Sequence, residues 1–125
     1  MVVNGYGNLS AVATTAPLAQ RERGVCCPPK DRPRADRVEA AVAVLKALAD
    51  PTRLAMALIL RDAEAPVCIC DLVGAFDLSQ PTVSHHMARL REAGLVESEK
   101  AGIWTFYRLR RDLPAATRRI IDAIA

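Results

Sequence analysis

Four cysteines stand in two close groups in the sequence: Cys26 with Cys27, and Cys68 with Cys70. In a reducing cytosol, this grouping favours metal binding or thiol redox chemistry over structural disulfides. Cys68 and Cys70 are two positions apart, so they cannot share one face of a regular helix. At the turn that begins a helix, however, both sulfur atoms can converge on one ion, and the helix N-terminus would favour the thiolate form.

Thiolates select soft ions, and a site of three sulfur atoms suits As(III). We therefore expect a site that combines Cys68 and Cys70 with Cys26, Cys27 or both, and that takes As(III) as an inducer. Sb(III), Cd, Pb, Zn and Cu(I) are alternative ions for the same ligands. Two other interpretations remain: oxidation of the thiols to a disulfide, or a simple role for Cys68 or Cys70 as a small buried hydrophobic residue.

A second group of polar residues lies at the start of a predicted helix, from Ser79 to Ala93, with Pro81 in its first turn. Glutamine can bond bidentately to adenine, serine and threonine can bond to bases or phosphates, and a helix N-terminus favours a phosphate oxygen. Such chemistry is typical of a recognition helix in a DNA major groove. The candidate contacts on this helix are Ser79, Gln80, Thr82, Ser84, His85 and Arg89.

The other face of the same helix is apolar. Val83, Met87 and Leu90 recur at helical spacing and should pack against the core. His85 and His86 are adjacent and point in different directions, which favours DNA contact or support of the helix over metal binding. The alternative for the whole polar face is a set of solvated and capping groups without a DNA ligand.

Around this helix the sequence predicts a mainly α-helical fold with a small β-hairpin. Asp50 and Pro51 begin one helix, an earlier core helix carries Val38, Val42, Leu45 and Leu48, and Gly102 lies in a hairpin turn. A hairpin that follows a helix-turn-helix is a wing, and Lys100 on this wing is a further candidate DNA contact. The expected helices cover residues 34–49, 51–60, 70–76, 79–93 and 113–125, and the expected strands cover 95–100 and 104–109.

Composition agrees with this layout. The 125 residues include 17 Lys and Arg against 14 Asp and Glu, a net charge of +3, which is compatible with nucleic-acid binding. No apolar stretch reaches the length of a membrane span and no signal peptide is evident, so we expect a cytoplasmic protein without a membrane partner. We expect a flexible arm over residues 1–35, which carries Cys26 and Cys27, and a DNA-binding and dimerisation domain over residues 36–125.

Four segments together resemble the ArsR/SmtB family of metalloregulatory repressors, in particular its arsenite-responsive members. The segments are residues 47–53 (ALADPTR), 68–72 (CICDL), 78–86 (LSQPTVSHH) and 107–109 (YRL). The resemblance implies a winged helix-turn-helix homodimer built from its first and last helices. It also implies an operator of double-stranded DNA with an inverted repeat, released when the inducer binds.

The sequence departs from the family pattern at two positions. Arsenite-responsive members carry a third cysteine three residues after the second, where this chain has Val73, so a third sulfur must come from elsewhere; some relatives use a cysteine pair in the N-terminal arm. Members also often carry arginine after the turn glycine of the wing, where this chain has Ile103. The minor-groove contact of the wing is therefore expected to be weak or to depend on Lys100.

The leading functional hypothesis is a repressor that releases its operator when As(III) binds. The alternatives are a repressor that senses thiol oxidation or Cd, Zn or Pb, and a metal-storage or metallochaperone protein. An enzyme is not expected, since the chain has no Cys-x-x-Cys in a βαβ setting, no phosphate-binding glycine loop and no catalytic triad. No organic cofactor is expected either.

Overall fold

The computed structural model describes residues 18, 20, 23–24 and 30–124. The chain divides into two compact units, Met1–Arg32 and Pro33–Ala125, and the account below concerns the second. Most of the expected N-terminal arm, including Cys26 and Cys27, lies outside the described residues.

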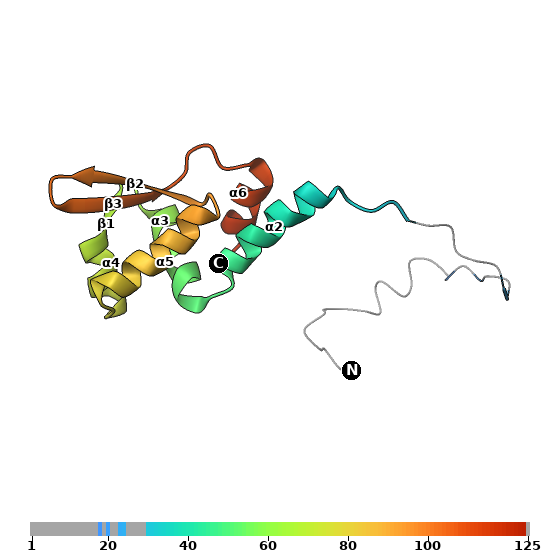
Figure 1. The fold of residues 1–125 in the computed structure, drawn as a ribbon, viewed down its shortest axis with the longest axis horizontal. Helices are drawn as coiled ribbons and strands as arrows, with labels where there is room; N and C mark the ends of the chain where they lie inside the picture. The colour runs from blue at the N-terminus through green and yellow to red at the C-terminus, as the bar shows by residue number, and fades with distance from the viewer. Residues whose placement is uncertain (1–17, 19, 21–22, 25–29, 125) are drawn as a thin grey trace. The chain divides into compact units, whose positions relative to one another are not determined.

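The second unit is mainly helical, with a three-stranded antiparallel sheet in the order β1-β3-β2. In Figure 1 the hairpin of β2 and β3 lies above α3 and α5, while α2 and α6 lie at the end away from the hairpin turn. This arrangement confirms the predicted winged helix-turn-helix. The helices are α2 (Ala35–Leu48), α3 (Pro51–Asp62), α4 (Ile69–Phe76), α5 (Gln80–Glu92) and α6 (Ala115–Ala123), and the strands are β1 (Val67–Cys68), β2 (Val96–Ala101) and β3 (Trp104–Leu109).

Strand β1 was not predicted from the sequence. Val67 pairs with Tyr107 and Cys68 pairs with Phe106, so the segment before α4 becomes the edge of the wing sheet. Two residues are too few to show the alternating pattern by which a strand is recognised, and the pairing depends on a partner about 40 residues away in the sequence. Because Cys68 belongs to β1, α4 begins at Ile69, one residue earlier than expected.

The corner between α2 and α3 is closed by two side chains. Asp50 is the N-cap of α3, and its Oδ2 accepts a hydrogen bond of 2.9 Å from the backbone N–H of Arg53. Arg53 then reaches back to the end of α2, where its Nε donates to the carbonyl of Ala47 at 2.7 Å and its Nη2 to that of Lys46 at 3.2 Å. Asp50 and Arg53 together therefore provide hydrogen-bond partners for a backbone N–H at the start of α3 and for two carbonyl groups at the end of α2.

The core confirms the predicted apolar face of α5. Val83, Met87 and Leu90 have no exposed surface, and neither do Met56 of α3 and Leu95, which leads into β2. Contacts of α5 with both α3 and α4 fix its rotation about its own axis. The polar residues between the buried positions are thereby turned outward.

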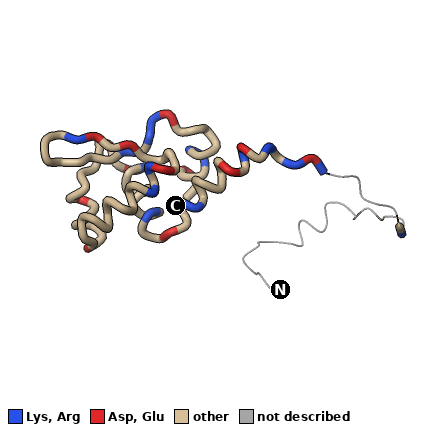
Figure 2. The backbone as a smooth tube through the Cα atoms, in the orientation of Figure 1, with Lys and Arg blue, Asp and Glu red and all other residues tan. Residues whose placement is uncertain are grey.

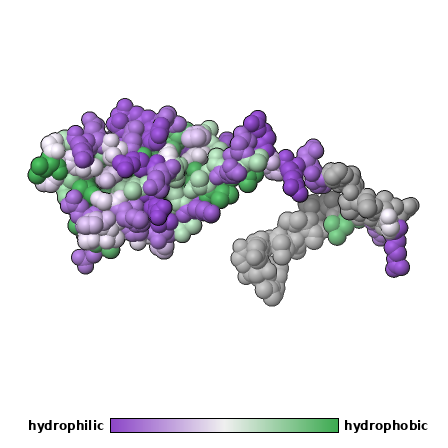
Figure 3. All heavy atoms as spheres, in the orientation of Figure 1, coloured by the Kyte–Doolittle hydropathy of each residue, from purple (hydrophilic) through white to green (hydrophobic). Residues whose placement is uncertain are grey.

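Helix α2 differs from the prediction. Its buried residues include Leu48, but Val38, Val42 and Leu45 are 45%, 39% and 51% exposed, so the expectation that these three enter the core was wrong. The apolar spacing is real, yet it marks a face of α2 that the described residues of this chain do not cover (Figure 3). Periodicity identifies an apolar face but not what packs against it.

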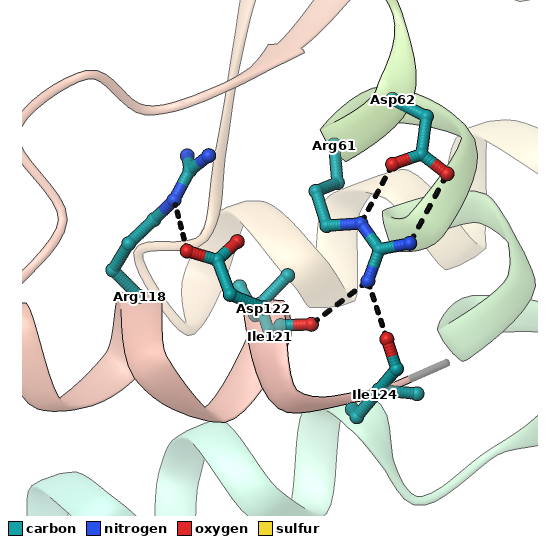
Figure 4. Close-up of polar contacts among 6 residues, drawn as sticks. All are labelled: Arg61, Asp62, Arg118, Ile121, Asp122 and Ile124. Atoms are coloured by element: carbon teal, nitrogen blue, oxygen red, sulfur yellow. Dashed lines mark hydrogen bonds and ion pairs between the residues drawn. The ribbon is translucent and has the colours of Figure 1, made fainter.

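Helix α6 is held by Arg61 at the end of α3 (Figure 4). The Arg61 Nη1 donates to the carbonyls of Ile121 at 3.1 Å and Ile124 at 2.6 Å, which are among the last carbonyls of α6. Asp62 accepts from Nε and Nη2 of the same guanidinium at 2.8 and 3.1 Å and so fixes its plane. These hydrogen bonds form a clamp, in which Arg61 of α3 holds the C-terminal end of α6 against the core.

Replacing Asp50 with Ala should lower the free energy of unfolding, because it leaves the first N–H groups of α3 without their acceptor. The hydrogen bond from the Arg53 N–H, opposed by burial, lowers the pKa of Asp50. The stabilisation is therefore complete above the ordinary carboxyl pKa and is lost as the pH falls through the lowered value.

Urea denaturation at fixed protein concentration should show that D50A has a lower free energy of unfolding than the parent at neutral pH, and that this difference shrinks in acid. Asp50→Asn, which preserves a cap, is the control; equal stability of parent and D50A would contradict the role.

Replacing Leu90 with Ala should cost about 2–5 kcal/mol of unfolding free energy, because a fully buried leucine leaves a cavity against the core. The neighbouring Arg89 is exposed, so Arg89→Ala is a matched control that should leave the unfolding free energy nearly unchanged. Chemical denaturation of both variants, followed by circular dichroism, measures the difference. Similar losses in the two variants would mean that α5 does not pack through this face.

Candidate functional site

The N-terminus of α5 is capped by Ser79. Its Oγ accepts from the backbone N–H of Thr82 at 3.3 Å and lies 2.8 Å from the Thr82 Oγ1. Ser79, Gln80 and Thr82 are all exposed, and no acidic residue lies in the first turn. The N-terminus of α5 thus presents backbone N–H groups and hydroxyls without an acidic residue in its own first turn, an arrangement that suits a phosphate oxygen.

The remaining candidates on α5 share its solvent side. Gln80 and Ser84 are four residues apart, as are His85 and Arg89, so each pair lies along one stripe of the helix. Gln80, His85 and Arg89 are exposed and Ser84 is half-buried. Arg89 lies 3.6 Å from Glu92 in an exposed ion pair, which in high dielectric holds the guanidinium only weakly. These side chains remain accessible to a ligand outside the protein.

His86 has a different environment from His85. Its Nδ1 lies 4.0 Å from the Asp50 carboxylate, and among the described residues it has no hydrogen-bond partner although the atom is buried. The imidazole therefore packs α5 against the corner of α2 and α3. This position corresponds to support of the helix, one of the two roles expected for the histidines.

The wing is joined to α5 as well as to the sheet. The Arg91 Nη1 donates to the Ser98 Oγ of β2 at 3.3 Å. Lys100, two residues further along β2, is exposed and pairs with Thr105 of β3 near the end of the hairpin. Ser98 and Lys100 lie on one face of the strand, so Lys100 extends the side of the wing that contacts α5.

Cys68 and Cys70 bring their sulfur atoms together at the start of α4. Cys68 is buried and is the N-cap of α4, and its Sγ accepts from the backbone N–H of Cys70 at 3.4 Å. The Sγ of Cys70 lies 2.6 Å from the Sγ of Cys68, and Cys70 is exposed. The two thiols therefore form one pair of adjacent sulfur atoms with an exposed side.

The direction of the pKa shift at Cys70 differs from the expectation. The thiol of Cys70 donates to the Cys68 sulfur, and this bond, with burial as a smaller cause, raises the pKa of Cys70. The helix N-terminus was expected to favour the thiolate form. The proximity of a second sulfur atom thus outweighs the effect of the helix N-terminus on the Cys70 thiol.

Within the described residues, Cys68 and Cys70 supply the only two cysteine sulfur atoms at the start of α4. Val73, one turn after Cys70, is half-buried and apolar. Among the described residues, no group of three or more His, Cys, Asp or Glu side chains could hold a metal ion. The other two cysteines, Cys26 and Cys27, lie outside the described residues.

An apolar groove of about 970 Å³ runs between α2 and α6. It is lined by Val38 and Ala41 of α2, by Ala116 and Ile120 of α6, and by Leu113 before α6. The groove continues the uncovered face of α2. Separately, none of the helices in the described ranges is long and apolar enough to cross a bilayer.

The sequence did not single out Arg53 and Arg61, which hold the scaffold of the site. Each lies in α3 and donates to the final carbonyls of another helix, Arg53 to α2 and Arg61 to α6. An arginine within a helix is ordinarily solvated, and the only sequence signal was the position of Arg53 three residues after the cap residue Asp50. The partner carbonyl groups become visible only when the helices are packed.

Residues 50–98, from the cap of α3 to β2, match the model of a family described as bacterial regulatory protein, arsR family. The chain is 46% identical over 81 residues to the arsenical resistance operon repressor of Escherichia coli K12, which covers 65% of this chain and 68% of that protein. The family match includes both the helix-turn-helix and the pair of Cys68 and Cys70.

Solved structures show the same fold. HlyU from Vibrio cholerae has a TM-score of 0.64 and 30% identity and covers 73% of this chain and 94% of its own. A homodimeric winged helix-turn-helix DNA-binding domain from Mycobacterium bovis has a TM-score of 0.60 and 24% identity, covering 72% of this chain and 79% of its own. At that identity, the second comparison shows the fold alone.

Proposed function

Because this chain belongs to the ArsR family of DNA-binding transcriptional repressors, which are not enzymes, we propose that it is an arsenite-responsive member whose cysteine thiolates bind As(III). The unliganded homodimer binds an inverted-repeat operator in double-stranded DNA, and As(III) releases it. The observation that carries the proposal is the pair of Cys68 and Cys70 sulfur atoms, 2.6 Å apart beside the helix-turn-helix. The protein acts in the cytoplasm, where its operator lies, and needs no organic cofactor.

In this proposal α5 reads the major groove. Gln80 and Ser84 contact base edges, His85 and Arg89 contact bases or phosphates, and the capped end with Ser79 and Thr82 binds a phosphate. Lys100 adds a contact from the wing. What supports this assignment is the exposure of these side chains on the one side of α5 that the core leaves open.

The inducer site requires a third sulfur. As(III) is satisfied by three thiolates, and the pair at α4 supplies two, so Cys26 or Cys27 supplies the third in the complete site. Loss of thiol protons accompanies binding, because the ligand is the thiolate form. The same donors accept Sb(III), Cd, Pb or Zn, which are therefore the alternative inducers.

The position of Cys68 couples the proposed As(III) site to the proposed DNA-binding surface. It caps α4, which packs against α5, and it pairs with Phe106 in β3 of the wing. Movement of Cys68 toward a third ligand would shift both DNA-contacting elements together. As(III) then favours a form with lower operator affinity, as linkage requires.

The uncovered faces of α2 and α6 support the homodimer. Val38, Val42 and Leu45 are exposed on α2, and the groove beside them contains Ile120 of α6. A second copy of this chain buries these apolar side chains by two-fold symmetry. Arg61 holds α6 in place for this contact.

A repressor that senses thiol oxidation is the second candidate, because the same sulfur geometry favours it. Cys68 and Cys70 would lose two protons and two electrons to an oxidant such as hydrogen peroxide, which is reduced to water, and would form one disulfide bond. A storage or metallochaperone role is less well supported, since it leaves the exposed polar side of α5 without a function.

Arsenite should lower the affinity of the full chain for a duplex selected from a random-sequence library, measured by fluorescence anisotropy. Cys68→Ser and Cys70→Ser should abolish the response, because each removes one of the two converging sulfur atoms. Cys26→Ser and Cys27→Ser, singly and together, identify the third ligand. Failure of arsenite to change the affinity of the parent would refute the assignment. Release by peroxide alone would favour the redox alternative.

Replacing Gln80 with Ala should weaken binding to the selected duplex by about 1–3 kcal/mol, because a bidentate base contact is lost. The loss should be confined to the selected sequence and vanish on a duplex changed at the contacted base pair. Lys100→Ala is the comparison: it should weaken binding to all duplexes and reduce the salt dependence by about one phosphate contact. Equal affinity of the parent for both duplexes would contradict base reading by α5.

A further inference from the structure

A small cavity of about 280 Å³ lies between the end of α3, the end of β3 and α6. Four arginines from different parts of the chain line it: Arg61 of α3, Arg108 of β3, Arg111 in the loop that follows and Arg118 of α6. Figure 2 shows Lys or Arg positions on this loop and on α6. Among the described residues that line the cavity, Glu64 is the only acidic one, and it is exposed.

The carboxylates that pair with two of these arginines do not line the cavity. Arg118 donates to Asp122 through its Nε at 3.1 Å, and in Figure 4 its terminal nitrogen atoms point away from that carboxylate. Arg108 likewise donates to Glu97 of β2 through its Nε. Within the described part of the chain, the terminal nitrogen atoms of Arg108 and Arg118 have no acceptor, so both guanidinium groups keep unused donors.

The other two arginines have different roles in the cavity wall. Arg111 is exposed and has no ion-pair partner among the described residues, because the neighbouring Asp112 is paired with Arg110 at 2.8 Å. The guanidinium of Arg61, in contrast, is already bonded to Asp62 and to the end of α6. The cavity therefore has three guanidinium groups with unused donors and a fourth that is fixed in the wall.

The chemistry of these groups indicates what the cavity can hold. Guanidinium groups donate pairs of parallel hydrogen bonds to carboxylate and phosphate oxygens. Several cations around one cavity also repel one another, and a bound anion offsets this repulsion. The walls between the arginines are apolar and include Leu60, Ala63, Pro66 and Leu109. The volume is slightly below the roughly 300–1,000 Å³ of pockets for drug-sized ligands, which favours a compact ligand.

We propose that this cavity binds a small oxyanion, either inorganic phosphate or a compact carboxylate with several acidic groups. The terminal nitrogen atoms of Arg108, Arg111 and Arg118 bind its oxygen atoms. Neither the cysteine pair nor any of the proposed DNA contacts lines this cavity. The proposal therefore goes beyond the proposed function and does not depend on it.

Isothermal titration calorimetry of the full chain with sodium phosphate and with sodium citrate, at constant ionic strength, tests the proposal. One of the two anions should bind saturably at one site per subunit, and the anion that does so identifies the ligand chemistry. Arg111→Gln and Arg118→Gln should each weaken this binding about tenfold, because each removes charged donors. Arg119→Gln is the matched control, since Arg119 is exposed on α6 beside Arg118 but does not line the cavity. The control should bind the anion as the parent does.

Glu64→Gln should have the opposite effect. It removes the carboxylate of the lining, so the anion should bind severalfold more tightly. Glu64 is exposed in the loop between α3 and β1, where the change leaves the core intact.

Absence of saturable binding with both anions would overturn the proposal. A loss of affinity in Arg119→Gln equal to that in Arg111→Gln would also overturn it, because net charge alone would then attract the anion. Displacement of the bound anion by a random-sequence DNA duplex would assign these arginines to a nucleic-acid surface instead. Binding that Arg111→Gln and Arg118→Gln weaken, that Glu64→Gln strengthens and that the duplex leaves unchanged would support the site.

Discussion

The burial of one side of α5 is the constraint on which the rest of the structure depends. Val83, Met87 and Leu90 are fully enclosed, and this single apolar stripe sets the rotation of the helix against α3 and α4. Since the opposite side must then face outward, the positions of Gln80, Ser84 and Arg89 follow from the core and not from any contact of their own. The polar surface that is proposed to face DNA is in this sense a consequence of the packing of α5.

Cys68 connects the proposed sensing site to that scaffold, because one residue belongs to three structures. It is a strand residue paired with Phe106, the N-cap of α4, and one half of the sulfur pair with Cys70. A buried residue with three such roles cannot shift without moving its neighbours, since the interior is close-packed. A displacement of the Cys68 sulfur by a bound ligand would therefore reach α5 through α4, and the wing through the pairing of β1 with β3.

The apolar surface that the described residues leave uncovered is divided between two places with different shapes. The face of α2 beside α6 is broad and forms a groove, which suits the flat, repeated contact of a second subunit. The tip of the wing is the end of a hairpin whose strands are fully paired, and it exposes two side chains, Ile103 and Trp104. Shape and charge distinguish these surfaces, although hydropathy alone does not.

The sequence by itself determined the helix-turn-helix, the wing, the Asp50 cap and the buried stripe of α5, because each depends on local spacing or local turn chemistry. Only the tertiary structure decided three other features. The pairing of Cys68 in β1 needs a strand about 40 residues away, the clamps of Arg53 and Arg61 need the carbonyl ends of other helices, and the exposure of Val38 and Leu45 needs the packed position of α2. Periodicity shows which side of an element is apolar, whereas only the assembled fold shows which partner is there to cover it.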